Sequence, residues 1–248
     1  MFRIDLNCDL GEGAGHDAEL MPLITSANIA CGAHAGDEAM MRTTVELAKK
    51  HEVAIGAHPG LADRENFGRR ELPVTPVEAH GLVLAQTRLL QVIARQRGAS
   101  VRHVKAHGAL YNLAARDAAL ARAVAEAVYE ADPRLILFVL AGSKLVEAGR
   151  ACGLQVASEV FADRTYQADG SLTPRSQPNA LITDENAAVA QVRRMVREGM
   201  ARATDGTDVK IAADTVCLHG DGANPVEFAR RLRIELTAAG IEIKAYGA

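Results

Sequence analysis

The chain has 248 residues, a length that suits one β/α barrel, since such barrels often form single domains of about 200–250 residues. Lys and Arg number 28 and Asp and Glu 31, and the net charge of -3 excludes a strongly basic nucleic-acid or membrane binder. Aromatic residues make up 4% of the chain and Trp is absent, which is too few for a platform that stacks sugars or bases. We therefore predict one folded domain over residues 1–248.

Nothing in the sequence predicts export or membrane insertion. No run approaches the roughly 18 apolar residues of a membrane span, and Asp5 stands where a secretory signal would begin its apolar segment. The cysteines are Cys8, Cys31, Cys152 and Cys217; they form no C-x-x-C pair, and three lie in apolar, strand-like runs. We expect four reduced structural thiols and a cytoplasmic protein.

Short apolar runs alternate with segments of helical periodicity along the chain. The expected strands span 4–8, 27–31, 53–57, 101–106, 135–140, 156–160 and 216–218. The expected helices span 78–97, 117–131, 184–201 and 226–239. Thr75 and Asn224 are expected to cap the first and last of these helices, because each precedes Pro and is followed three residues later by Glu. Strands that alternate with helices form parallel β/α units.

Two longer irregular segments, 60–73 and 162–178, follow expected strands and mix Gly, Pro, Asp and Arg. Loops of this length inside a compact domain usually act as lids or binding loops. The pairs Arg193-Arg194 and Arg230-Arg231 lie on expected helices, where a solvated outer face explains them better than a binding patch.

Polar residues gather at the carboxyl ends of the expected strands. The loops that follow these ends in a parallel barrel form one rim, which carries the active site. The clusters are Asn7-Cys8-Asp9 with Glu12, His34 with Asp37, His58, Lys105 with His107, Glu159 with Asp163-Arg164, and His219 with Asp221.

Side-chain alternation predicts which of these groups share a face. Asp5, Asn7 and Asp9 project together, and the same spacing groups Lys105 with His107. We expect the polar faces to point into the barrel, where polar groups are unfavourable unless they pair or bind a ligand. A purely structural polar network is the alternative.

Several weaker motifs predict no site. His103 and His107 lie about 13 Å apart on a strand that rises about 3.3 Å per residue, so one metal cannot bind both. We expect His51, His80 and His103 to lie at the surface or to face helices. The run Gly11-x-Gly13-x-Gly15 lacks dinucleotide-binding spacing, and Gly142-Ser143-Lys144 lacks the first glycine of a P-loop.

The strand ends carry a series of motifs. They are DLNCDLGE (5–12), ANIACGAHAGD (27–37), GAHPG (56–60), NFGR (66–69), VKAHGALYN (104–112), EVFADR (159–164) and CLHGD (217–221). On these motifs the sequence resembles the LamB/YcsF family over nearly its whole length. Ala33 and Ala106 stand where the family usually has Phe and Pro, which changes the bulk near the rim but no expected catalytic group.

The resemblance implies an α/β fold, a seven-stranded β/α (TIM-like) barrel of the glycoside hydrolase and deacetylase type. It also implies a subunit that works with two partner subunits as an ATP-dependent 5-oxoprolinase, which hydrolyses 5-oxoproline to L-glutamate. Because the chain has no P-loop, we expect ATP to be used by the complex and handled together with the partners.

Lactam hydrolysis needs a base for water, a cation for the developing oxyanion and an acid for the nitrogen. We expect Asp9 to be the base, Lys105 the cation, and His107, with a near-neutral pKa, the acid, with Glu12 nearby as a further catalytic carboxylate. The expected substrate-binding residues are Asp5, Asn7, His34, Asp37, His58, Arg69, Glu159, Arg164, His219 and Asp221.

Two alternatives remain open from the sequence. The first is a metal-dependent amide hydrolase or deacetylase on the same barrel, with a divalent metal held by ligands drawn from His34, His58, His107 and His219 with Asp9 or Asp37. The second is a non-catalytic subunit that presents 5-oxoproline to its partners.

Overall fold

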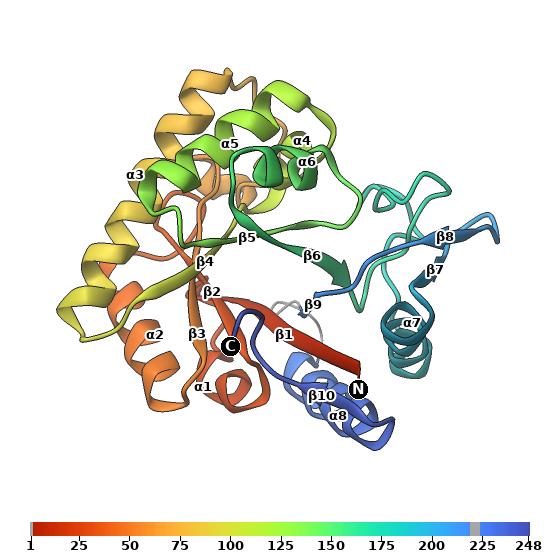
Figure 1. Ribbon diagram of the computed structural model, residues 1–248. Helices are drawn as coiled ribbons and strands as arrows, with labels where there is room; N and C mark the ends of the chain where they lie inside the picture. Colours follow the sequence, from red (N-terminus) through yellow and green to blue (C-terminus); the bar gives the residue numbers. More distant parts are fainter. Residues whose placement is uncertain (1, 219–223) are drawn as a thin grey trace.

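The protein is built around a closed parallel barrel (Figure 1), seen in a computed structural model that describes residues 2–218 and 224–248. In the described residues, seven strands form the barrel in the order β1-β2-β3-β4-β5-β6-β9, and β9 pairs back onto β1. They are β1 (Phe2–Leu10), β2 (Ser26–Ala30), β3 (Ala54–His58), β4 (Val101–Lys105), β5 (Ile136–Leu140), β6 (Gln155–Phe161) and β9 (Thr215–Leu218). The predicted seven-stranded β/α barrel is therefore confirmed.

Strand β1 closes the barrel. One of its edges pairs with β2, whereas the other is shared by β9, beside Asp5–Cys8, and by β10 (Ile241–Ile243), beside Phe2–Ile4. A small antiparallel pair, β7 (Met200–Arg202) and β8 (Asp208–Lys210), lies outside the barrel. The sequence did not predict β7, β8 or β10, because three residues are too few to show an alternating pattern.

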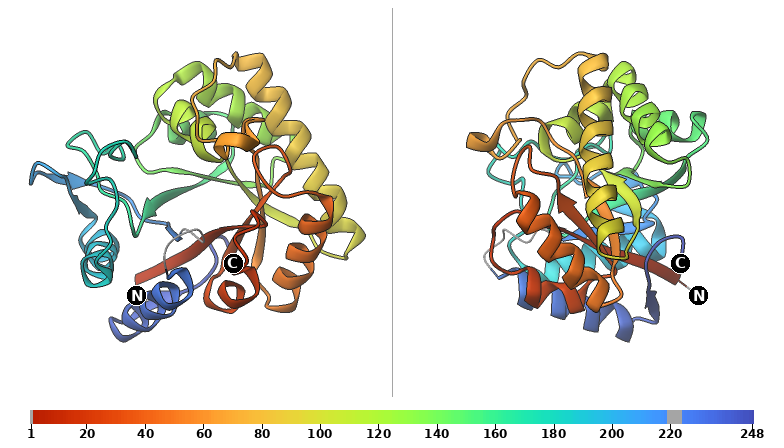
Figure 2. Two further views of the ribbon diagram at one scale, coloured as in Figure 1. Left: turned by 180° about the vertical axis from the view of Figure 1, so that it is seen from behind. Right: turned by 90° about the vertical axis from the view of Figure 1, so that its left-hand side faces the viewer.

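Helices cover the outside of the barrel (Figure 2). They are α1 (Asp17–Leu20), α2 (Glu38–Lys50), α3 (Pro76–Gln96), α4 (Gly108–Arg116), α5 (Ala118–Ala131), α6 (Lys144–Ala151), α7 (Glu185–Glu198) and α8 (Pro225–Ala238). Two 3-10 turns, η1 (Met21–Leu23) and η2 (Arg64–Asn66), complete the described helical elements. The four predicted helices are confirmed as α3, α5, α7 and α8, with ends that differ by a few residues.

The helix termini show which capping predictions hold. Thr75 and Glu78 form the predicted capping box at the start of α3. Asn224 precedes α8, but its side chain accepts no hydrogen bond from the helix, so the predicted cap there is wrong. Helix α7 ends at Glu198, earlier than predicted, because Gly199 adopts a left-handed backbone with φ of 65°.

The two faces of β1 separate apolar from polar side chains, as the alternation predicts. Ile4, Leu6 and Cys8 are fully buried in the hydrophobic core between the barrel and its helices. Asp5 and Asn7, equally buried, hydrogen-bond across the barrel interior to Ser26, Thr215 and Glu159. The barrel interior is therefore polar, unlike the usual packing of branched apolar side chains.

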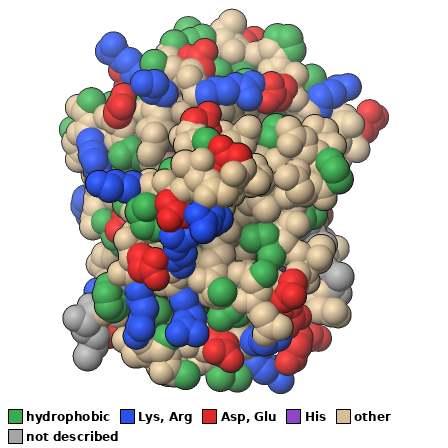
Figure 3. All heavy atoms as spheres, turned by 90° about the vertical axis from the view of Figure 1, so that its right-hand side faces the viewer, with side chains coloured by type: hydrophobic (Ala, Val, Ile, Leu, Met, Phe, Trp, Pro, Cys, Tyr) green, Lys and Arg blue, Asp and Glu red, His purple; other side chains and the backbone are tan. Residues whose placement is uncertain are grey.

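The outer surface carries charges of both signs. Figure 3 views the side on which α7, β7 and β8 lie, where Lys and Arg side chains are interspersed with Asp and Glu. Arg194 pairs there with Glu198 and Asp208, which agrees with the predicted solvated helix face. Among the described residues, no helix combines the length and apolar character needed to cross a membrane.

Candidate active site

A pocket of about 860 Å³ opens at the carboxyl ends of the barrel strands. Both irregular segments predicted to be binding loops contribute to its wall, with Arg69 and Glu71 from the first and Arg164, Gln167 and 169–176 from the second. The expected site residues that line it are Asp9, Glu12, His58, Arg69, Lys105, His107 and Arg164. The rim position predicted from the polar strand ends is therefore where the structure places them.

Buried amide and hydroxyl groups form the floor of the site. The Asn28 amide donates to Asn7 Oδ1 at 2.7 Å and to Asp9 Oδ1 at 2.8 Å, which fixes the orientation of two β1 side chains. Deeper in the barrel, Ser26 Oγ donates to Asp5 at 2.7 Å and Thr215 also donates to this carboxyl. Burial raises the pKa of Asp5 despite these hydrogen bonds. Asp5 therefore supports the floor, beneath the lining of the pocket.

Lys105 is the cation at the centre of the site. It is 2% exposed, and its ammonium lies 3.0 Å from Asp9 Oδ1 and 2.8 Å from Glu159 Oε1. Burial alone would lower its pKa, but the surrounding negative charge, Asp9 first, raises the pKa well above the ordinary value. The ammonium also donates to Cys217 Sγ at 3.0 Å, so this thiol faces the barrel interior. Lys105 is therefore held fully charged.

His103 corrects one sequence interpretation. We expected it at the surface or facing a helix, but it is 1% exposed and points into the barrel. Its Nε2 donates to Asn28 Oδ1 at 2.8 Å, its ring stacks on Phe138, and burial lowers its pKa to about 3. Gly56 makes room for this ring, because a Cβ atom there would lie 2.0 Å from His103 Nε2.

Above Lys105, four side chains converge at the pocket mouth: Glu12, His34, His58 and His107. Their ligand atoms all lie within 4.8 Å of one another, and the three imidazoles are buried. Glu12 Oε1 lies 3.2 Å from His34 Nε2, 3.4 Å from His107 Nδ1 and 3.8 Å from His58 Nε2. The glycine-rich loop after β1 thus bends Glu12 toward the rim, as expected from the sequence.

Backbone carbonyls fix the orientation of two of these rings. His58 Nδ1 lies 2.8 Å from Lys105 O, and His107 Nε2 lies 2.8 Å from Phe67 O, so each of these nitrogens carries a proton. The remaining nitrogens, His58 Nε2 and His107 Nδ1, face each other at 2.9 Å. In the neutral rings both carry lone pairs, and two lone pairs at this distance repel unless a proton or a cation lies between them.

This arrangement fits a divalent cation. Three imidazole nitrogens and one carboxylate oxygen are a common ligand set for zinc, and a tetrahedral site with bonds of about 2.0–2.1 Å places its ligands about 3.3 Å apart. The separations of 3.2–3.8 Å around Glu12 Oε1 are close to that value, and the other separations between ligand atoms lie between 2.9 Å and 4.8 Å. The hydrogen bonds of His58 and His107 to carbonyls are the outer contacts that usually orient metal-binding histidines.

The expected near-neutral pKa of His107 is wrong. Burial, then the positive charge that His58 and His34 can carry, lowers the pKa of His107 to about 2. His58 differs, because Asp9 Oδ2 lies 3.4 Å from its Nε2 and raises its pKa above the ordinary value despite burial. His107 is thus a neutral ring near pH 7, and its expected role as the acid stays a prediction.

The other expected residues have varied positions. Glu159 is fully buried beside Lys105, and Arg164 lines the pocket at 6% exposure. Arg69 is exposed at the mouth, with its guanidinium 4.8 Å from the centre of the Phe67 ring. The exposed Asp37 caps α2 by accepting from Met40 N and does not line the pocket. His219 and Asp221 lie outside the described residues.

Several site residues were not among the predicted ones. Tyr111 donates to Glu159 Oε2 at 2.6 Å and lines the pocket, and Asn28 links β1 to His103. Asn28 and His103 could have been found by extending to β2 and β4 the alternation used for β1. Tyr111 lies on α4, and only the folded structure brings it beside Glu159.

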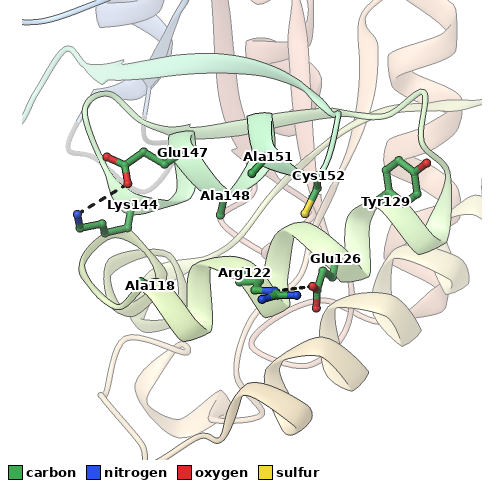
Figure 4. Close-up of a pocket in the computed structure, with 9 residues that line it drawn as sticks. All are labelled: Ala118, Arg122, Glu126, Tyr129, Lys144, Glu147, Ala148, Ala151 and Cys152. Atoms are coloured by element: carbon green, nitrogen blue, oxygen red, sulfur yellow. Dashed lines mark hydrogen bonds and ion pairs between the residues drawn. The ribbon is translucent and has the colours of Figure 1, made fainter.

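A second hollow lies between α5 and α6 (Figure 4). Its wall carries two ion pairs, Arg122 with Glu126 and Lys144 with Glu147, beside Tyr129. It contains none of the predicted site residues, so the rim pocket is the candidate active site.

The fold and the rim pocket together define a TIM-like β/α barrel of the deacetylase type, with its site at the carboxyl ends of the strands. The chain belongs to the LamB/YcsF family, whose sequence pattern matches residues 4–248. It is 58% identical, over 99% of both chains, to a protein of Shouchella clausii named as a 5-oxoprolinase subunit. It is also 46% identical to the lactam utilization protein from Thermus thermophilus, with a TM-score of 0.92 over 98% of this chain and 100% of the other. A peptidoglycan deacetylase from Bacillus subtilis, 12% identical with a TM-score of 0.50 over 98% and 87% of the two chains, shares the fold.

Proposed function

We propose that this protein is the lactam-opening subunit of an ATP-dependent 5-oxoprolinase, which hydrolyses 5-oxoproline to L-glutamate. The position of Asp9 carries the proposal: its carboxylate lies 3.0 Å from the Lys105 ammonium and 3.4 Å from His58 Nε2, in the lining of the pocket. The names of the relatives, which refer to 5-oxoprolinase and to lactam utilization, support this substrate.

The groups around Asp9 suit hydrolysis of an unstrained amide. Asp9 accepts a proton from water, and the water oxygen adds to the lactam carbonyl carbon. Lys105, held charged between two carboxylates, stabilises the negative charge that develops on the carbonyl oxygen. The ring C–N bond then breaks, and Asp9 returns its proton to the nitrogen, which gives glutamate or, when the lactam oxygen carries a phosphate, the acyl phosphate of glutamate. We assign this return to Asp9 because it holds the proton taken from water in the first step.

The proposed reaction also requires partner subunits that handle ATP. A five-membered lactam opens reluctantly, and transfer of the terminal phosphate of ATP to its oxygen, with release of ADP, would activate the ring carbon toward water. After the C–N bond breaks, a second water would hydrolyse the resulting acyl phosphate to glutamate and phosphate. The sequence has no P-loop, so we assign the nucleotide-binding fold to two partner subunits in a cytoplasmic complex. The relatives are named as one subunit of 5-oxoprolinase, which supports an assembly of several chains.

The test measures ATP-dependent glutamate release from 5-oxoproline, with this chain alone and with its candidate partners. We expect release only from the complex. Asp9→Asn should lower turnover about 10²-fold, the usual contribution of a positioned base, and leave the KM for 5-oxoproline nearly unchanged. Asp169→Asn, at an exposed position in the same pocket, is the control and should keep full turnover. If Asp9→Asn raises KM instead and keeps turnover, the chain is a binding subunit; if the complex releases no glutamate, the proposed reaction is wrong.

The second candidate is a metal-dependent amide hydrolase, which the cluster of Glu12, His34, His58 and His107 favours. A divalent cation held by these four residues would supply Lewis acidity beside Asp9. Purified chain incubated with zinc and then desalted should retain one equivalent, and zinc should raise its melting temperature. His34→Gln should lose both effects, whereas the surface control His80→Gln should keep them. If wild-type protein retains no zinc, cobalt or manganese, this candidate is excluded.

A further inference from the structure

The N-terminus of α6, which follows β5, lacks a side-chain cap. Gly142 adopts a left-handed backbone with φ of 74°, and Ser143 follows as the N-terminal cap of α6 in an extended conformation. Most serines at this position accept a hydrogen bond from the first turn, but the Ser143 side chain makes no such bond. The first N–H groups of any helix lack acceptors within it, so this turn presents donors toward whatever lies in front of it.

The Ser143 hydroxyl is the first sign of a ligand. Ser143 is 8% exposed and lines the rim pocket, and its Oγ has no hydrogen-bond partner among residues 2–218 and 224–248. A buried hydroxyl without a partner is unfavourable, and nearly all such groups in folded proteins are hydrogen-bonded. In its present rotamer the Oγ is covered by protein atoms, so a rotation of the Ser143 side chain is needed to turn the hydroxyl toward a group that enters the pocket.

Arg164 is the second sign. It lines the same pocket from the loop after β6, the strand beside β5, and it is 6% exposed. Its guanidinium donates to two backbone carbonyls, Thr173 O at 2.6 Å and Ala180 O at 3.2 Å, and no described carboxylate forms an ion pair with it. Burial and the nearby charge of Arg175 lower the pKa of Arg164 to about 10, which still leaves it charged near pH 7. A buried positive charge of this kind favours an anion beside it.

We propose that the N-terminus of α6, Ser143 and Arg164 form a subsite for a phosphoryl group inside the rim pocket. A phosphate group accepts hydrogen bonds from several directions at once, which matches backbone N–H groups, a hydroxyl and a guanidinium. A single carboxylate would use fewer of these donors. The arrangement resembles a P-loop in placing Gly142-Ser143-Lys144 between a strand and a helix, although the first glycine of that motif is missing.

This subsite deepens the proposed function, on which its role in catalysis rests. The phosphoryl group has two sources in that reaction, the terminal phosphate of a nucleotide presented by a partner and the phosphate of an activated lactam. Both would be held in the pocket that contains Asp9 and Lys105. The subsite itself belongs to this chain and can be tested without partners.

The experiment is a titration of the full chain with inorganic phosphate, followed through backbone amide resonances and by calorimetry. We expect the Lys144 and Leu145 amides to shift, and Ser143→Ala to weaken phosphate binding about tenfold without loss of stability. Arg164→Met should weaken it further, and Ser100→Ala, at an exposed position outside the pocket, should bind as wild type does. If phosphate binds with no shift at these amides, or Ser143→Ala binds it normally, the subsite is wrong.

Two further arms separate the possible ligands. In one, 5-oxoproline replaces phosphate; if it shifts the same amides and needs Ser143, the subsite holds the substrate carboxylate and the phosphoryl assignment is overturned. In the other, Ser143→Ala is assayed within the complex, where we expect a raised KM for ATP and an unchanged KM for 5-oxoproline. Unchanged values of both KM would overturn the role in the reaction. A complex inactive with wild-type chain would refute the proposed function, whereas the phosphate titration would still decide the subsite.

Discussion

Replacing Lys105 by Met should destabilise the protein strongly, because it leaves two buried carboxylates without their cation. Asp9 is 9% exposed and Glu159 is fully buried, and their oxygens lie 3.0 and 2.8 Å from the ammonium. Removing one partner of a buried ion pair typically costs about 3–5 kcal/mol. In a domain of this size each kcal/mol lowers the melting temperature by about 2–4 °C, so we expect a decrease of about 6–20 °C at neutral pH.

The pH dependence distinguishes this cause from a simple loss of packing. In the wild-type protein the raised pKa of Lys105 means that its stabilising effect is fully present below the unfolded value and is lost only at strongly alkaline pH. In Lys105→Met, protonation of one carboxylate relieves the repulsion, so the deficit should shrink as the pH falls.

Thermal unfolding followed by circular dichroism between about pH 5 and 8 measures both effects. The double variant Lys105→Met with Glu159→Gln should recover part of the lost stability, and Lys50→Met at the exposed end of α2 should change it little. An unchanged melting temperature, or a decrease that does not depend on pH, would refute the reasoning.

Three further predictions concern residues around the site. Gly56→Ala should destabilise the protein by about 1–3 kcal/mol, because the new methyl group would overlap His103; an unchanged denaturant midpoint would contradict this. The pKa of His103 is about 3, so ¹⁵N spectra of the ring nitrogens should show a neutral ring at about pH 5. The stability of the protein should fall as the pH drops from 6.5 toward 3, because the folded state binds fewer protons than the unfolded state. A thiol reagent should label Cys152 in the native protein and all four cysteines only after denaturation. The reason is that Cys8, Cys31 and Cys217 are buried, and burial raises the pKa of Cys31 to about 12. Rapid labelling of all four without denaturant would contradict this.

The barrel was predictable because short apolar runs alternate with helical segments along the chain and end in polar clusters. The alternation along β1 predicted which side chains enter the barrel, and the polar strand ends predicted the rim as the site. The same alternation along β4 puts His103 on the face of Lys105, but a lone histidine near the start of a strand is also typical of a surface position, and so its burial was missed.

The remaining features depend on contacts that only the fold creates. The pKa of His107 is set by burial, by His58 at the end of β3 and by His34 in the loop after β2. The four-residue cluster brings Glu12 together with three histidines from three other strand ends, and no local pattern predicts that these four side chains meet. Tyr111 and Ser143 are ordinary helix residues until the barrel places them in the pocket.

The closure of the barrel by its first and last strands also has a consequence for synthesis on the ribosome. The hydrogen bond between Asn7 and Thr215 joins residues 208 positions apart, so β1 leaves the ribosome long before the strand that completes its surroundings. During that interval the inward face of β1 carries Asp5, Asn7 and Asp9, which water can solvate without a partner. A nascent apolar face would instead favour association with neighbouring chains, a hazard for slowly formed parallel sheets. We therefore expect the polar interior that serves the site also to keep this face of the first strand hydrated until the last strand arrives.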